Sequence, residues 1–258
     1  MRQLGCAIEE LEGRKPNIHA ARKQLKRARA TLRLLRAAIG DELYRRENVV
    51  ARDSARPLSS ARDDEVMSDA LKGLAERFGT TISAVDMPKA AHGVSARRLA
   101  SIRAALKSAM TRAQAWRPDA QGWDSIATGL RSTYRRARRA LRRARKDRAV
   151  EDLHEWRKQT KYLWHQLQIL APIAPGPVGE LADEYHHLAD YLGDEHDLAV
   201  LRSRVPASAT ELVDRRREEL QDKAFALGER LYADKSKTFV HSLEKHWTQW
   251  QHQERRDT

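Results

Sequence analysis

Residues 18–36, IHAARKQLKRARATLRLLR, decide the fold class, because apolar side chains recur along them at intervals of three and four. This spacing predicts one buried stripe on an amphipathic helix. The stripe consists of Ile18, Ala21, Leu25, Ala28, Leu32 and Leu35. Residues 153–170, LHEWRKQTKYLWHQLQIL, repeat the same intervals with Leu153, Trp156, Thr160, Leu163, Leu167 and Leu170. The sequence therefore predicts two helices that share one packing template.

The remaining sequence also favours helix. Ala, Leu, Arg, Glu and Lys are abundant, and only 12 Gly and 8 Pro occur in 258 residues. Stretches that alternate β-branched with polar residues, the pattern of a half-buried strand, are absent. We therefore expect an all-α protein.

The order of segments suggests an internal duplication. LSSARDDEVM (58–67) follows the first template helix, and LGDEHDLAVL (192–201) follows the second, each at a distance of about forty residues. Pro118 and Gly122 indicate a connection between the halves. We expect a single domain over 1–258, with a first helical half at about 10–116, a second at about 123–205 and a C-terminal helical extension at about 210–252.

The charge balance predicts a polyanionic partner. The chain has 49 Lys and Arg against 36 Asp and Glu, a formal net charge of +13. Both template helices place cations and a histidine on one face, at offsets of zero, three, four and seven. These are His19, Arg22, Lys23 and Lys26 in the first helix and His154, Arg157, Lys158 and Lys161 in the second.

The densest positive charge lies at residues 129–148, GLRSTYRRARRALRRARKDR, with ten basic side chains and one acid. One face of the predicted helix carries Arg131, Arg135, Arg138, Arg142 and Arg145. Repulsion costs a few tenths of a kcal/mol for each like-charged pair, so a row of this length favours a bound anion.

Several functional classes lack support. No span approaches the roughly 18 apolar residues of a transmembrane helix, so we expect no membrane partner. The single cysteine, Cys6, excludes an intramolecular disulfide framework and fits a reducing, cytoplasmic compartment. No Gly-rich phosphate loop or serine elbow is present, so we expect no catalytic residues, no cofactor and no enzymatic activity.

A metal centre is a further alternative. Glu151 and His154, and likewise Glu184 and His187, have the Glu-x-x-His spacing of di-iron bundles. Because His154 shares its predicted face with Arg157, Lys158 and Lys161, that face is a poor place for a dication, and we expect no metal ligands.

Five segments in this order resemble the CHAD domain, an α-helical domain named for its histidines. The resemblance covers roughly residues 10–205. It rests on IHAARKQLKRARATLRLLR, ARDDEVM, GLRSTYRRARRALRRAR, LHEWRKQTKYLWHQLQIL and LGDEHDLAVL. It implies two helical bundles related by a pseudo-twofold axis, a basic central channel or groove, binding of inorganic polyphosphate, and a location at polyphosphate granules with their associated proteins.

The resemblance also implies the contact residues. They are His19, Arg22, Lys23, Lys26, Arg29, Arg33, Arg62, Arg131, Arg135, Arg138, Arg139, Arg142, His154, Arg157, Lys158, Lys161 and His196. Arg62 stands where the duplication would place a counterpart of His196. Asp63, Asp194 and Asp197 are expected to orient arginines, and helix capping is an equal alternative for Asp194.

Alternatives to polyphosphate binding stay open at this point. RNA or DNA phosphates would suit the same charge, although Tyr134, Trp156 and Trp164 fall mostly at apolar positions rather than in a stacking platform. An enzyme acting on phosphoanhydrides has the least support, since acidic metal ligands are not evident. Basic helix faces are also commonly just solvated surface, and histidines are often bonded within a bundle.

The two template histidines suggest a pH effect. If His19 and His154 gain charge beside phosphate, binding should tighten as the pH falls from about 8 to about 6.

Overall fold

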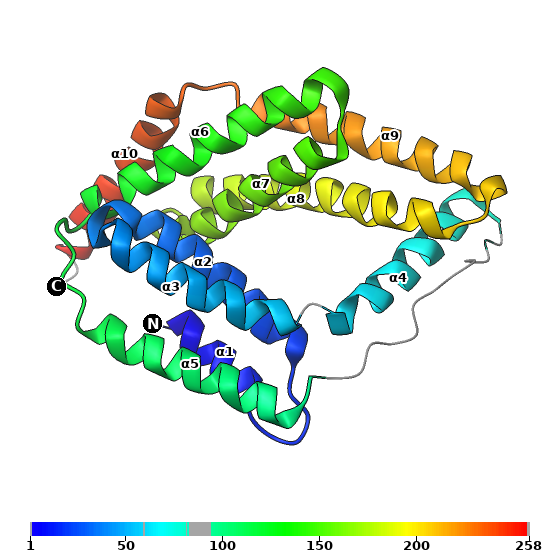
Figure 1. The fold of residues 1–258 in the computed structure, drawn as a ribbon. Coiled ribbons are helices and arrows are strands. Elements are labelled where there is room, and N and C mark those ends of the chain that lie inside the picture. Colours follow the sequence, from blue (N-terminus) through cyan, green and yellow to red (C-terminus); the bar gives the residue numbers. More distant parts are fainter. Residues whose placement is uncertain (1, 59, 81, 83–93, 257–258) are drawn as a thin grey trace.

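The computed structural model describes residues 2–58, 60–80, 82 and 94–256, and for residues 60–66 it describes the backbone alone (Figure 1). Regular structure in this part of the chain is entirely helical, which confirms the all-α prediction. The α-helices are α1 (Arg2–Glu10), α2 (Ile18–Ile39), α3 (Asp41–Ala55), α4 (Ser60–Phe78), α5 (Ala96–Gln114), α6 (Asp124–Asp147), α7 (Val150–Leu170), α8 (Pro177–Leu201), α9 (Ala207–Leu231) and α10 (Ser236–Glu254). Short 3-10 turns are η1 (Arg56–Leu58), η2 (Ala171–Ile173) and η3 (Arg202–Arg204).

Local chemistry explains where the first template helix begins and ends. The Asn17 side chain accepts a hydrogen bond from the Ala20 N–H at 3.0 Å, which caps the start of α2. Gly40 ends the helix with a φ of 81°, a conformation that glycine adopts without a Cβ clash. The chain therefore turns sharply into α3.

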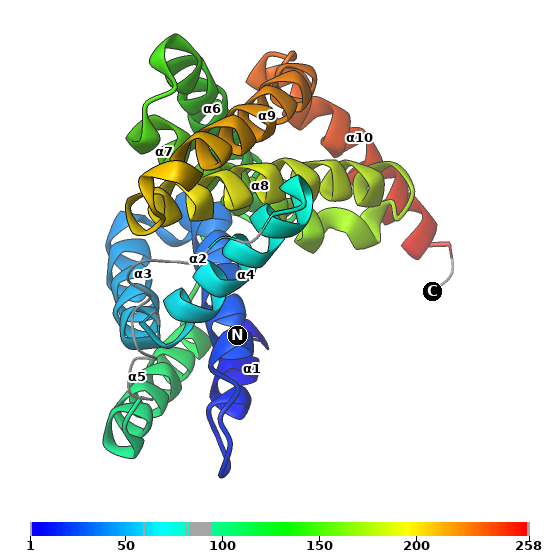
Figure 2. The same ribbon diagram turned by 90° about the vertical axis from the view of Figure 1, so that its right-hand side faces the viewer.

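The helices form two groups that share α2. The main body contains α6, α7, α8, α9 and α10, and the second group contains α1, α2, α3 and α5 (Figure 1). Since α2 also packs against α6 and α7, it joins the two groups. Helix α4 leaves the second group and packs on α8 and α9 (Figure 2).

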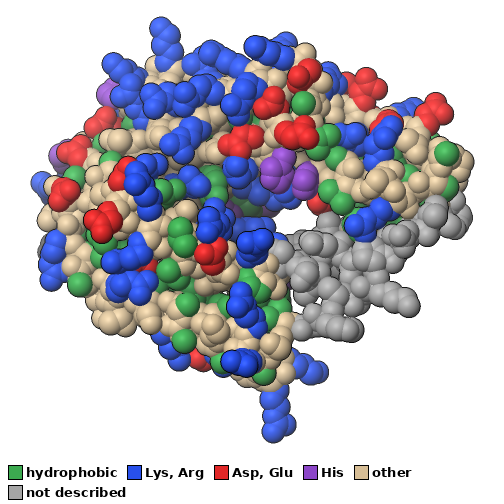
Figure 3. Space-filling view, viewed as in Figure 1, with side chains coloured by type: hydrophobic (Ala, Val, Ile, Leu, Met, Phe, Trp, Pro, Cys, Tyr) green, Lys and Arg blue, Asp and Glu red, His purple; other side chains and the backbone are tan. Residues whose placement is uncertain are grey.

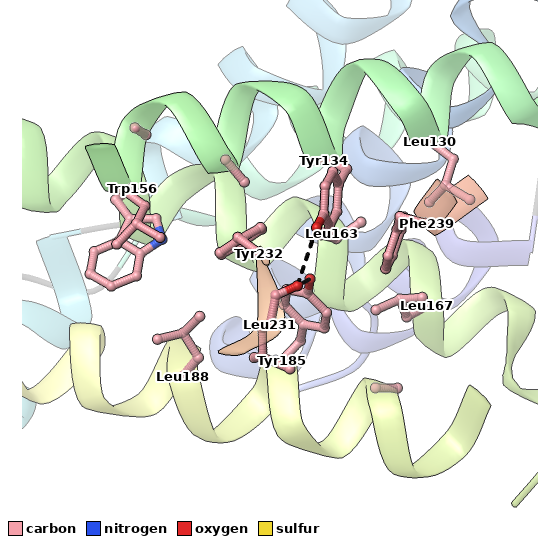
Figure 4. Close-up of a cluster of buried hydrophobic side chains, with 14 of the residues drawn as sticks. Leu130, Tyr134, Trp156, Leu163, Leu167, Tyr185, Leu188, Leu231, Tyr232 and Phe239 are labelled. Carbon is pink, nitrogen blue, oxygen red and sulfur yellow. Dashed lines mark hydrogen bonds between the residues drawn. The ribbon is translucent and has the colours of Figure 1, made fainter. Parts of the chain in front are cut away.

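Several large aromatic side chains pack among leucines in the core of the main body (Figure 4). Tyr134 of α6 stacks on Phe239 of α10 with ring centroids 4.1 Å apart. The hydroxyls of Tyr134 and Tyr185 both donate to the Leu231 carbonyl oxygen, at 3.3 and 3.0 Å. Burial raises the pKa of Tyr134 to about 12, so this hydroxyl stays protonated and donates at neutral pH. The end of α9 is thereby bonded to α6 and α8.

Both predicted stripes face packed interiors. Ala21, Leu25, Ala28 and Leu32 of α2 are buried, and the two end members of that stripe are half-buried. All six members of the α7 stripe are buried. Thr160, the one polar member, is fully buried and bonds the Tyr232 hydroxyl at 3.2 Å.

The two template helices are followed by different elements. In the first half α3 lies between α2 and η1, and residues 58–67 span the end of η1 and the beginning of α4. In the second half α8 follows η2 directly, and residues 192–201 lie inside this one helix. The pseudo-twofold relation between the halves stays a prediction.

Gly129 lets α2 and α6 approach closely. A Cβ at this position would lie 2.7 Å from the Arg33 carbonyl oxygen and closer still to that of Leu34. Because both obstacles are backbone atoms, Gly129→Ala should force the helices apart and lower the free energy of unfolding by roughly 3 kcal/mol or more. Urea denaturation followed by circular dichroism measures this loss.

Gly179→Ala is the matched control, since a Cβ there meets nothing within 4 Å in the first turn of α8. We expect its free energy of unfolding to stay within about 1 kcal/mol of wild type, in the stabilising direction. Equal losses in the two variants would contradict the close approach at Gly129.

Candidate anion-binding site

One side of α2 carries a continuous row of cations. His19, Arg22, Lys26, Arg29 and Arg33 follow one another at intervals of three and four, and the row spans about 20 Å at the rise of an α-helix. Its members are tied to neighbouring elements: the Arg22 Nη1 donates to the Leu58 carbonyl oxygen at 3.1 Å, and the Arg29 Nε donates to the Asn48 side chain at 3.2 Å. Lys26 and His19 are exposed, and so is Lys23 beside the row.

Helices α7 and α8 supply the residues opposite this row. The rings of His154 and His196 lie 4.7 Å apart, so the two predicted histidines meet across the α7–α8 interface. A Cβ added at Gly193 would lie 3.8 Å from the Arg157 Nε, which shows that this guanidinium packs against the backbone of α8. Lys158 instead forms an ion pair with Glu155 on its own helix.

Electrostatic interactions connect five of the predicted residues on α2, α7 and α8, which we call the central cluster: Lys26, His154, Arg157, Lys161 and His196. Lys158 also acts on His154 but pairs with Glu155. Near the centre of the face shown in Figure 3, Lys, Arg and His side chains border a hollow. The cluster thus joins residues of three helices that are far apart in the sequence.

Lys161 has the most perturbed amine of the cluster. Partial burial of its side chain and then the positive charges of Arg157 and Lys26 lower its pKa to about 7, against the opposing effect of Asp190 and Asp197. An amine in this environment is only partly protonated at neutral pH. A bound anion would restore its charge.

The histidines of the cluster are neutral at physiological pH. Burial, followed by the charges of Arg157, His154 and Lys161, lowers the pKa of His196 to about 4. Burial, Arg157 and Lys158 likewise lower the pKa of His154. In the free protein the ring of His196 is therefore neutral between pH 6 and 8, and the ring of His154 is mainly neutral above its ordinary pKa of 6.5.

Acidic side chains border the cluster on α8. Burial raises the pKa of Asp194, and the nearby carboxylates of Asp190 and Asp197 raise it further. Asp194 and Asp197 line a pocket of about 290 Å³ between α4, α8 and α9, together with Arg216. Asp63 and Arg62 belong to the part of α4 whose side chains are outside the described structure.

The sequence analysis did not identify an aromatic side chain that lies between α2 and α7. Tyr162 of α7 lies under the guanidinium of Arg33, whose centre is 4.1 Å from the ring centroid, and Arg29 lies 5.9 Å from the same centroid. Such contacts hold arginines in place without neutralising their charge. The position of Tyr162, one residue after Lys161, was the available signal.

The basic row of α6 lies on another surface. Arg138 donates to the Ala233 carbonyl oxygen at 3.3 Å, and Arg145 pairs with Glu229 of α9, so this flank of α6 faces the turn between α9 and α10. The predicted residues Arg131, Arg135, Arg139 and Arg142 are exposed. None of them forms an ion pair with an acid in the described chain. The opposite flank, with Arg136 and Arg143, faces α2 and α7 instead.

Two of the four residues considered for a metal have other partners. His154 packs on His196, and Glu184 pairs with Arg230 of α9. Among the residues that the structure describes, no three His, Cys, Asp or Glu side chains form a group that could hold a metal ion. Over the same residues, none of the helices combines the length and the apolar character needed to cross a membrane.

Comparison with known proteins adds one finding. The family model described as CHAD domain matches residues 7–206. No curated protein and no solved structure matches the chain. The matched range contains α2, α6, α7 and α8, and therefore the whole central cluster.

Proposed function

The chain belongs to the CHAD domain family, and we propose that it binds inorganic polyphosphate along a basic groove formed by α2, α7 and α8. CHAD domains are linked to polyphosphate binding in general. The observation that carries the proposal for this chain is the central cluster, in which burial and the neighbouring charges of Arg157 and Lys26 depress the pKa of Lys161. Holding these cations close together costs free energy, and a bound ligand with closely spaced negative charges would offset that cost.

The chemistry of polyphosphate fits such a groove. The ligand is a flexible strand with about one negative charge per phosphate and no base to read, so it requires only donors spaced along a surface. Arg provides a guanidinium fork for phosphate oxygens, and Lys provides a compact charge. The α2 row and the central cluster supply both. We further propose that the protein associates with polyphosphate granules. We also propose that it binds polyphosphate without hydrolysing it.

Calorimetry with a long polyphosphate chain at two salt concentrations tests the proposal. Each phosphate contact releases counterions, and a single strand loses affinity with a log–log slope of about 0.7 per contact. Five contacts predict a loss of roughly 100-fold between about 50 and about 200 mM salt. An affinity that does not depend on salt concentration would contradict the proposed polyphosphate binding. Release of phosphate from polyphosphate by the pure protein with magnesium would show that the protein hydrolyses its ligand.

Nucleic acid is the second candidate, because the exposed arginines of α6 form a ridge without acidic partners in the described chain. Competition separates the candidates. If polyphosphate occupies the groove, RNA at an equal phosphate concentration should leave most of it bound. Complete displacement by RNA would favour the second candidate.

The binding should depend on pH through Lys161. Phosphate stabilises the protonated amine, so the complex takes up a proton when it forms above the free pKa of about 7. Affinity should therefore fall as the pH rises from 7, by up to about tenfold per unit until the pKa of the complex is reached. Because the pKa values of His154 and His196 are depressed in the free protein, we expect the lysine rather than these histidines to take up the proton above pH 7.

Calorimetry in two buffers of different ionisation enthalpy counts the protons taken up. Near pH 8 we expect close to one proton for wild type and almost none for Lys161→Arg, whose guanidinium is always charged. Lys158→Arg, on the same helix, should behave as wild type. An unchanged proton count in Lys161→Arg would exclude this lysine as the titrating group.

A further inference from the structure

A second polar pocket lies beyond Tyr162, between α2, α3, α6 and α7. Its volume is about 300 Å³, and its walls include Arg33 and Arg36 of α2 and Thr128, Ser132 and Arg136 of α6. We propose that this pocket binds a compact phosphate group of about two negative charges. The group is either the terminal phosphate of a polyphosphate chain or a free orthophosphate, and only the first source rests on the proposed function.

The two principal walls place donors opposite each other. Thr128, Ser132 and Arg136 are four residues apart, so they form a ladder of two hydroxyls and a guanidinium along one face of α6. Arg33 and Arg36 are three apart on α2 and face the same space. The close backbone contact at Gly129 holds the two helices together beside the pocket.

The positive charge in the pocket is only partly compensated. Asp41 accepts two hydrogen bonds from Arg36, at 2.7 and 2.9 Å, which neutralises that guanidinium. The Arg33 Nε is buried and has no hydrogen-bond partner among the described residues, while its Nη2 lies 3.5 Å from the Tyr162 hydroxyl. Arg136 forms no ion pair with any acid of the described chain.

A small dianion matches what the pocket lacks. A buried guanidinium nitrogen without an acceptor costs free energy, and a phosphate oxygen would supply the acceptor. Arg33 and Arg136 would balance two negative charges, and the hydroxyls of Thr128 and Ser132 would donate to the remaining oxygens. An internal phosphate of a chain carries only about one charge, so the pocket prefers an end group.

Arg33 also belongs to the row on α2, which leads from the central cluster past Tyr162 to this pocket. A chain bound along the row would therefore present its last phosphate to Arg33 and Arg136. The pocket would therefore bind the terminal phosphate of a chain that lies in the groove.

Calorimetry with orthophosphate, linear tripolyphosphate and cyclic trimetaphosphate tests the inference, because the cyclic compound has no chain end. Wild type is compared with Arg136→Gln and with Arg142→Gln, a control that removes an exposed guanidinium from the opposite flank of the same helix. Circular dichroism verifies that both variants keep their helix content.

We expect Arg136→Gln to bind linear tripolyphosphate about tenfold more weakly than wild type and to bind cyclic trimetaphosphate equally well. Arg142→Gln should bind both compounds as wild type does. If Arg136→Gln loses affinity for the linear compound alone, the chain end is the ligand of the pocket. If Arg136→Gln also loses affinity for orthophosphate, the free ion is a ligand of the pocket. This result stands even if long polyphosphate does not bind. Equal behaviour of the two variants with all three compounds, or no binding of the linear compound and orthophosphate, overturns the inference.

Discussion

Ending the chain after Arg204 is expected to abolish the cooperative folded state, although the family match ends only two residues later, at residue 206. The deleted helices α9 and α10 supply part of the main core. Their buried members are Ala224, Phe225, Leu231, Tyr232, Phe239, Val240 and Leu243. Burial of one large apolar side chain contributes about 1.5–3 kcal/mol, so the deletion removes on the order of 10 kcal/mol. That is comparable to the whole net stability of a typical domain.

The deletion also removes the partners of buried polar groups. The Tyr134 and Tyr185 hydroxyls lose the Leu231 carbonyl oxygen that accepts their hydrogen bonds. Glu195, whose side chain is 2% exposed, loses the donors on Arg217 and Gln221, which lie 2.8 and 3.1 Å from its Oε1. An unpaired carboxylate in this position would cost several kcal/mol.

Thermal unfolding followed by circular dichroism checks this prediction. The truncated chain should show no cooperative transition and should bind a hydrophobic dye. A chain that ends at Gln251 is the control, because it lacks only the C-terminal residues whose described members, 252–256, are exposed. A sharp unfolding transition of the truncated chain within a few degrees of the control would contradict the prediction. It would show that α9 and α10 contribute little to the stability of the domain.

Local patterns were sufficient to predict the helices of the templates. The spacing of Leu25 and Leu32 in α2, and of Leu163 and Leu167 in α7, depends only on the helical period, and all four side chains are buried as expected. The resemblance to CHAD domains, rather than periodicity, placed His154 and His196 in one candidate site, and their ring centroids lie 4.7 Å apart. Periodicity thus predicted which face of each template helix is buried.

Periodicity could not predict which flank of α6 faces α2 and α7. Arg131 and Arg138 lie on one side of the apolar stripe, and Arg136 and Arg143 lie on the other, with no local signal to distinguish them. The difference arises from tertiary packing, because α9 and α10 cover the first flank and Asp152 of α7 pairs with Arg143 on the second. Arg136 therefore entered the candidate site only from the structure.

Burial of polar side chains was a second source of error. Gln166 is fully buried and donates to the Ala30 carbonyl oxygen and to Thr133 at 3.2 and 3.1 Å, a contact that depends on the crossing of α2, α6 and α7. His19 and His154 were expected to gain charge beside phosphate as the pH falls from about 8 to about 6, but partial burial and the charges of Arg157 and Lys158 lower the pKa of His154 in the free protein. Neither effect has a signature in one sequence.

Replacing Lys26, Arg157 and Lys161 together by Ala should weaken the binding of long polyphosphate by about 1,000-fold. A hydrogen bond to a charged group contributes about 1.5–3 kcal/mol, and three such losses exceed the roughly 4 kcal/mol of a 1,000-fold change. The measurement is calorimetry at constant, low salt. The slope of affinity against salt should also fall by about two, since three contacts are lost.

The fold should tolerate this triple replacement. A pKa of about 7 for Lys161 means that its protonated form is disfavoured in the folded protein, so its removal relieves a cost between pH 7 and the ordinary value of 10.5. Lys26 is exposed and Arg157 half-buried, and neither belongs to the hydrophobic cores. Unchanged helix content by circular dichroism is therefore expected, and any loss of binding reports on the groove.

A second triple variant separates the groove from the general charge of the protein. Replacing Arg131, Arg135 and Arg139 of α6 by Ala removes the same net charge of three from exposed positions. If the ligand occupies the groove, this control should lose less than about tenfold, since distant charges act only through a screened field. Equal losses in the two variants would mean diffuse attraction, and a larger loss in the α6 variant would move the binding site to the ridge, where nucleic acid is the better-supported ligand.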